Sequence, residues 1–112
     1  MAEGVERQER YAQNEALFRE VNERIRTQAE QWIRTTDPVE FMCECANPAC
    51  VERISVGIED YESARAHPAR FLVSPGHLDL EVERVILERD EFWIVEKHGA
   101  AGVAAAELDP RA

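Results

Sequence analysis

The chain has 112 residues, of which 45% are hydrophobic and 7% aromatic, which suits one globular domain and is too short for two. It carries 13 Lys and Arg against 23 Asp and Glu, and the formal net charge of -10 argues against nucleic-acid binding, which needs an excess of basic residues. No apolar stretch is long enough to span a membrane and the first residues lack the pattern of a secretory signal, so we expect a cytoplasmic protein without membrane association.

A long helix is predicted from about residue 6 to residue 34, where helix formers dominate and Pro and Gly are absent. Apolar residues recur there at spacings of three and four and form one stripe, with Leu17 beside it: Phe18, Val21, Ile25, Ala29, Trp32 and Ile33. Charged residues such as Arg19 fall largely outside the stripe. We expect the stripe to pack on the sheet of its own domain, and the alternative is a homodimer through a two-helix seam.

Apolar positions become sparse before Leu17, so residues 1–13 are predicted to form a flexible or frayed extension. A single domain is expected over residues 14–98. The Ala-rich residues 99–112 have little side-chain area to bury and are predicted to be a tail or a weakly held helix.

Two strands around a turn should follow the long helix. Residues 35–38 end the helix, because proline lacks the amide donor and disfavours helical geometry in the residue before it. Residues 39–43 and 51–56 have the composition and alternation of strands, and the Asn-Pro pair within residues 46–49 indicates a turn between them. Gly57 ends the second strand.

The middle of the chain predicts a short helix and a tight turn. Residues 58–66 can form the helix, with Tyr61 and either Ala64 or Arg65 on the same side. Residues 71–73 are a buried extended run. In residues 74–77 a proline is followed by a glycine, as a type II turn prefers at its two central positions.

A hairpin is the clearest strand pair, with strands at residues 82–87 and 92–96 and a four-residue loop at residues 88–91. The predicted fold class is therefore α+β. A long N-terminal helix packs on a small antiparallel sheet that carries a cysteine turn, with a short helix in the middle of the chain.

All three cysteines, Cys43, Cys45 and Cys50, lie within eight residues, and the turn between them could bring their sulfurs together. In a cytosolic protein such clustering favours a metal site or redox chemistry over structural disulfides. Zinc takes four tetrahedral ligands, and thiolates from a strand end and the next turn can meet at one ion. The segment therefore predicts a zinc knuckle, and the alternatives are thiol oxidation or simple burial.

A fourth zinc ligand is needed, and His77 is the best candidate. It follows the predicted type II turn, where a side chain projects, and comes after a run expected to lie beside the cysteine-bearing strands. Other candidates are His67, His98, the carboxylate of Glu44 and water.

Enzyme activity is not predicted. The chain lacks the nucleotide-binding, serine-hydrolase and zinc-protease motifs. No acidic residue lies in apolar sequence as a tuned general acid would, so we expect a solvated acidic face. Trp32 and Trp93 are predicted core residues.

The leading functional prediction is a small zinc-stabilised interaction or regulatory module. Residues 35–112 hold sixteen acidic and seven basic side chains, which favours a basic or neutral protein partner. The alternative is a redox sensor in which oxidation of the cysteines expels zinc. A zinc hydrolase is less favoured, because it requires an open coordination position and a nearby base.

Residues 14–25, the Phe-Met-Cys-Glu-Cys segment at residues 41–45 and the Pro-Gly-His turn at residues 75–77 carry a family resemblance, together with Cys50, Tyr61 and the Arg70-Phe71 pair. Over about residues 14–97 the chain resembles a family of small uncharacterised proteins from actinobacteria and related high-GC bacteria. The resemblance implies a bacterial cytoplasmic source and groups the cysteine segment with the Pro-Gly-His turn. It implies no activity.

Overall fold

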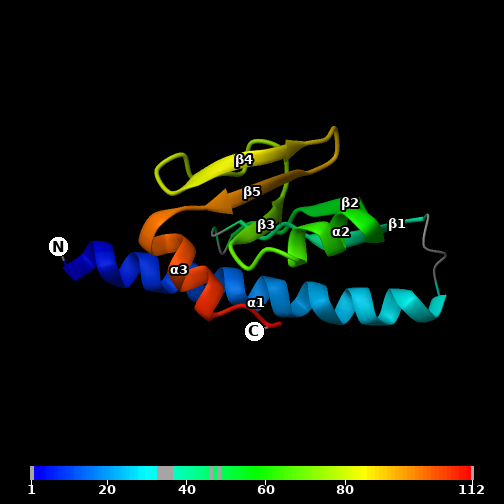
Figure 1. Ribbon diagram of the computed structural model, residues 1–112, viewed down its shortest axis with the longest axis horizontal. Coiled ribbons are helices and arrows are strands. Elements are labelled where there is room, and N and C mark those ends of the chain that lie inside the picture. The colour runs from blue at the N-terminus through cyan, green and yellow to red at the C-terminus, as the bar shows by residue number, and fades with distance from the viewer. Residues whose placement is uncertain (1, 33–36, 46, 48, 112) are drawn as a thin grey trace.

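The structure is a computed structural model that describes residues 2–32, 37–45, 47 and 49–111, and for residues 2–12 and 32 it describes the backbone alone. The elements are α1 (Ala2–Trp32), β1 (Pro38–Met42), β2 (Arg53–Gly57), α2 (Ile58–Arg65), β3 (Arg70–Val73), β4 (Glu83–Glu88), β5 (Trp93–Lys97) and α3 (Gly99–Glu107). The predicted α+β class is confirmed. Figure 1 shows α1 along one side of the molecule, and its 31 residues extend over most of the 48 Å long axis. None of the described helices combines the length and apolar character that crossing a membrane requires.

The antiparallel strands form two small sheets. β1 pairs with β2, while β5 lies between β3 and β4 in the second sheet (Figure 1). The two sheets meet just after β1, where the Glu44 amide donates a hydrogen bond of 2.8 Å to the Leu72 carbonyl. The cysteine segment therefore begins at the junction of the sheets.

The C-terminal half of the chain follows the predicted order. The hairpin loop closes through a hydrogen bond of 2.9 Å from the Arg89 amide to the Phe92 carbonyl, one residue later than expected. Of the two alternatives for the Ala-rich segment, residues 99–107 form the helix, and Ala105 is buried. α3 approaches the end of β5 closely at Gly102, where a Cβ would stand only 2.7 Å from the Lys97 carbonyl oxygen.

The apolar core has two parts. The larger one joins α1, α2 and the β1–β2 sheet to Leu72 and Ile94 of the second sheet. It contains Phe41 and Tyr61, whose rings stack with centroids 4.3 Å apart. The smaller one contains Phe71, Val73, Val95, Ala105 and Cys43, with Cys45, Cys50, Leu78, Val85 and Trp93 packed against it. Trp93 contributes to the core as predicted, while the side chain of Trp32, Ile33 and the predicted end of the helix at residues 35–36 lie outside the described residues.

The inward face of α1 combines part of the predicted apolar stripe with buried polar residues that were not predicted. Ala29 is buried and Ile25 packs against the core, but Leu17 is 55% exposed. The expectation that Arg19 lies outside the packed face is wrong, because this residue is 1% exposed. Its guanidinium donates hydrogen bonds of 2.7 Å each to the carbonyls of Pro68 and Ala105. Hydrogen bonds to carbonyls that need a donor thus replace part of the apolar packing of α1.

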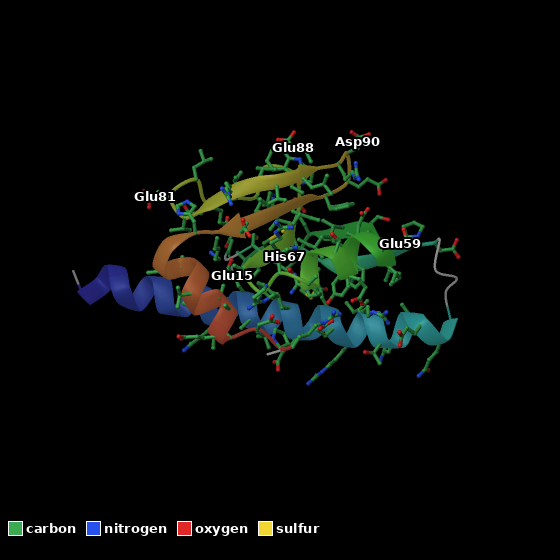
Figure 2. All side chains as sticks on the ribbon, in the orientation of Figure 1. Glu15, Glu59, His67, Glu81, Glu88 and Asp90 are labelled. Carbon is green, nitrogen blue, oxygen red and sulfur yellow. The ribbon has the colours of Figure 1, made fainter. Side chains whose placement is uncertain are left out.

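Three carboxylates are also buried, so the expectation of a wholly solvated acidic face is wrong for Glu15, Glu44 and Glu83. Figure 2 shows Glu15 between α1 and the strands, while Glu59, Glu81, Glu88 and Asp90 lie at the outer surface. The ammonium of Lys97 lies 3.1 Å from the Glu15 carboxylate and 3.2 Å from that of Glu83. One lysine therefore forms ion pairs with two buried carboxylates and connects α1 to the hairpin.

Stability should depend on pH through Glu15. Burial raises its pKa from about 4.5 to about 7, against the attraction of Lys97. Its Oε2 has no hydrogen-bond partner within the described part of the chain. The raised pKa adds stability that is complete below pH 4.5 and is lost as the pH rises through 7. Relative to Glu15→Gln, the wild type should therefore lose about 3 kcal/mol of unfolding free energy across this window.

Urea unfolding of both variants at a series of pH values, at equal zinc concentration, measures this difference. Glu20→Gln is the matched control, because Glu20 is exposed on the same helix. Parallel pH profiles for the wild type and Glu15→Gln would contradict the prediction.

Candidate metal centre

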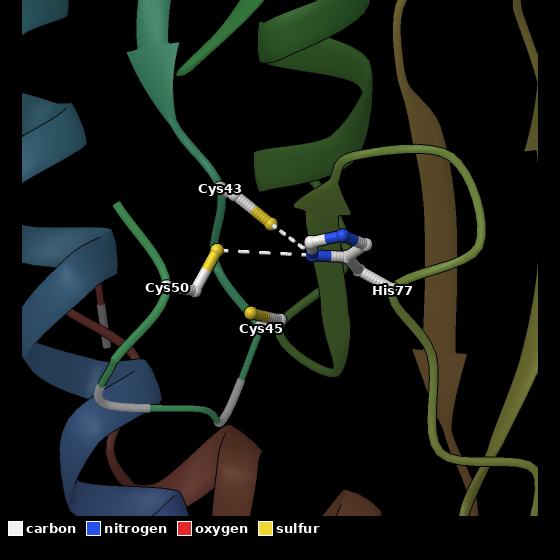
Figure 3. Close-up of side chains that lie close together, drawn as sticks. All are labelled: Cys43, Cys45, Cys50 and His77. Carbon is white, nitrogen blue, oxygen red and sulfur yellow. Dashed lines mark hydrogen bonds between the residues drawn. The ribbon is translucent and has the colours of Figure 1, made fainter. Parts of the chain in front are cut away.

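The structure brings the four predicted site residues together. Cys43 follows β1 directly and Cys45 comes two residues later, while Cys50 stands at the end of the turn and His77 follows β3. The ligand atoms of the four residues all lie within 4.8 Å of one another. Figure 3 shows the three sulfurs and the imidazole ring facing a common centre.

The distances suit a tetrahedral ion. The His77 Nδ1 lies 3.7 Å from the Cys43 sulfur and 3.7 Å from the Cys50 sulfur (Figure 3). In a tetrahedron with zinc–sulfur bonds of about 2.3 Å and a zinc–nitrogen bond of about 2.05 Å, sulfur and nitrogen are about 3.6 Å apart. These residues can therefore hold a zinc-sized ion with small adjustments.

The knuckle is held by backbone hydrogen bonds. The Cys43 amide donates to the Glu52 carbonyl at 3.0 Å, which joins the two arms on either side of the turn. The Cys50 amide donates to the Asn47 carbonyl at 3.0 Å, and the Ala49 amide donates to the Asn47 side chain at 3.0 Å. An asparagine that caps the following amides in this way is typical of a tight turn, and it brings Cys50 back toward the other sulfurs. Residues 46 and 48 of the predicted turn lie outside the described residues.

The predicted type II turn presents His77. The His77 amide donates to the Ser74 carbonyl at 2.9 Å, which closes the turn, and Gly76 has a φ of 85°. This positive φ is the value that the third residue of a type II turn requires and that glycine adopts without strain. The turn thus directs the imidazole toward the cysteines.

Local hydrogen bonds lower the pKa of one of the cysteine thiols, that of Cys43. The hydrogen bond from the Cys45 thiol lowers the pKa of Cys43 to about 5, against the effect of burial, and the Ser74 amide, 3.2 Å from the same sulfur, lowers it further. The same hydrogen bond raises the pKa of Cys45. The lowered pKa of Cys43 favours the thiolate form, which is the form that binds a metal ion.

Among the described residues the other ligand candidates do not join the cluster. His67 and His98 are exposed and stand outside it. Glu44 is fully buried, and its carboxylate accepts hydrogen bonds from the Arg65 guanidinium at 2.6 Å and from the Leu72 amide at 2.9 Å. Its oxygens are thus committed to protein partners, although it stands between two of the ligand cysteines.

The Glu44 network anchors the cysteine segment to α1. Asn22 donates a hydrogen bond of 2.7 Å to the Glu44 carboxylate. The same amide group donates to the Met42 carbonyl at 2.9 Å and accepts from the Met42 amide at 2.8 Å, as a neighbouring strand would. The segment that carries Cys43 and Cys45 is therefore held from α1 on one side and from β3 on the other.

Sequence reasoning did not identify the supporting residues. The alternation of side chains along an extended segment indicates that Glu44 points away from its two cysteine neighbours, but not which residue it meets. The sequence predicts either Ala64 or Arg65 on the same side of α2 as Tyr61, and the structure buries both of them with Tyr61. No short-range signal marks Asn22, whose partners are 20 and 22 positions away.

Comparison with known proteins gives no match: no protein-family model, curated protein or solved structure corresponds to this chain. The resemblance to the actinobacterial family therefore stays a prediction.

Proposed function

We propose that this chain is a small zinc-stabilised module that binds a protein partner. The observation that carries the proposal is the cluster of three cysteine sulfurs and one imidazole nitrogen within 4.8 Å. Thiolates are soft ligands, and a tetrahedral set of three sulfurs and one nitrogen is typical of structural zinc. Four protein ligands fill the tetrahedron and leave no position for an activated water, which supports a structural role over hydrolysis.

The ion would connect segments that are distant in sequence. Cys43 and Cys45 extend from β1, Cys50 precedes β2 and His77 follows β3, so one ion bridges the junction of the two sheets. Such a bridge contributes directly to the free energy of folding, because the unfolded chain cannot present the four ligands together.

The charge and the outer surface of α1 support the interaction role. A net charge of -10 favours a basic or neutral protein as partner. A homodimer through α1 is the alternative assembly, and the exposed Leu17 on this helix supports it. The three cysteines are free, which fits a reducing cytoplasm.

Elemental analysis tests the proposal. Protein purified without chelator or metal-affinity tag should carry about one zinc per chain, as one set of four ligands implies. Mild peroxide should leave this zinc bound, since Cys43 is 1% exposed and metal-held thiolates are masked. His67→Ala should retain the same zinc content, because His67 lies outside the cluster.

Two outcomes would contradict this expectation. Zinc far below one equivalent, with three freely titrating thiols, would exclude the metal site. Fast and reversible zinc release at low peroxide would favour the redox sensor that uses the same cysteines.

A further inference from the structure

The two ring nitrogens of His77 face different groups. Nδ1 lies 3.7 Å from two of the cysteine sulfurs, as described above. Nε2 lies 3.4 Å from Oε2 of Glu52, a residue that the sequence pattern did not identify. A single imidazole therefore stands between the candidate metal position and a carboxylate.

Glu52 is held in this position by its backbone. Its carbonyl accepts the hydrogen bond from the Cys43 amide, and β2 begins at the next residue, Arg53. Its side chain is 56% exposed and has no other ion-pair partner among the residues that the structure describes. The carboxylate is thus available to interact with His77, and its removal should leave the core intact.

We propose that Glu52 is a positioning residue of the metal site, an inference that rests on the zinc site proposed above. The carboxylate lies 3.4 Å from Nε2 of His77, so that in the zinc-loaded protein it would accept a hydrogen bond from Nε2–H. A proton held on Nε2 leaves the lone pair on Nδ1, the nitrogen that faces the sulfurs. The carboxylate also fixes the ring plane, as outer carboxylates do for metal-bound histidines.

The test compares zinc affinity among three variants, measured by competition with a chromophoric chelator. Glu52→Ala should bind zinc roughly 10 to 100-fold more weakly than the wild type. Glu52→Gln should recover part of this loss, because its amide oxygen can still accept from Nε2–H. Glu40→Ala is the matched control: it removes a 71% exposed carboxylate with no contact to His77 and should retain wild-type affinity.

A nitrogen NMR spectrum of the zinc-loaded protein gives a second measurement, which general stability would not change. The wild type should show His77 protonated at Nε2 with the metal on Nδ1. In Glu52→Ala the Nε2 proton should exchange faster with solvent, because no carboxylate protects it.

The outcomes separate the inference from the proposed function. If the wild type binds no zinc, the proposed function fails. If the wild type binds zinc and Glu52→Ala binds it equally well, or if Glu40→Ala loses as much affinity, the zinc site stands and the role of Glu52 is excluded. Should Glu52→Ala fail to fold, Glu52→Gln becomes the test of the role of Glu52. Its spectrum must then show zinc on Nδ1, and its zinc affinity must be lower than that of Glu40→Ala.

Discussion

Cys50→Ser should lower the melting temperature of the zinc-loaded protein by more than about 10 °C. Structural zinc supplies on the order of 10 kcal/mol of apparent binding free energy in small domains, comparable to the whole stability of a domain. Loss of one third of this, about 3 kcal/mol, lowers the melting temperature of a domain of this size by about 12 °C. Calorimetry or circular dichroism at saturating zinc measures the effect. His77→Ala should lower the melting temperature less, because water can occupy the position of the imidazole.

Chelation provides the control for this prediction. With zinc removed from both proteins, Cys50→Ser and the wild type should melt at the same temperature, because Cys50 is half-buried and its hydroxyl substitute has nearly the same shape. An unchanged melting curve for Cys50→Ser in the presence of zinc would reject the structural role of the ion.

Glu44→Gln should destabilise the protein by about 3–5 kcal/mol, the loss found when one partner of a buried ion pair is removed. The Glu44 and Arg65 side chains are 0% and 1% exposed, so the amide would leave a guanidinium charge inside the protein without a counter-charge. The Gln amide also offers a donor where the Asn22 amide already donates. Denaturant unfolding of the zinc-loaded variant gives the free energy, and chelator competition should show weaker zinc binding.

Two comparisons make this prediction specific. Glu40→Gln changes an exposed carboxylate on β1 that lies 3.9 Å from Arg53, and such surface pairs contribute about 1 kcal/mol or less. In the double variant Glu44→Gln/Arg65→Met no unpaired charge remains, so much of the lost stability should return. A loss for Glu44→Gln no larger than that for Glu40→Gln would contradict the buried ion pair.

Elements with a strong local signal could be predicted from the sequence. Helix formers without Pro or Gly predict α1 from residue 6 onward, alternation predicts β1 and β2, and the Pro-Gly pair predicts the turn that carries His77. The four candidate ligands were identified for the same reason, because cysteine spacing and turn chemistry are local properties.

The polar interior could not be predicted, because its partners are distant in sequence. The buried Arg19 side chain donates hydrogen bonds to the carbonyls of Pro68 and Ala105, which lie 49 and 86 positions away. Periodicity assigns such a charged residue to solvent, since charged side chains are rarely buried without a partner. Only the tertiary fold supplies those partners, and Glu15 and Glu44 were misplaced for the same reason.

The support of α1 by distant residues has a consequence for biosynthesis. Arg19 can form its hydrogen bond to the Ala105 carbonyl only after Ala105 has been synthesised. Glu23 likewise depends on Arg111, which binds both Glu23 and Glu62. A ribosome adds about 5–20 residues per second, so the 86 positions between Arg19 and Ala105 take roughly 4–17 s to synthesise. During that time α1 has no complete docking site, and an isolated helix is only marginally stable in water. The N-terminal element of this chain is therefore among the last to reach its final place.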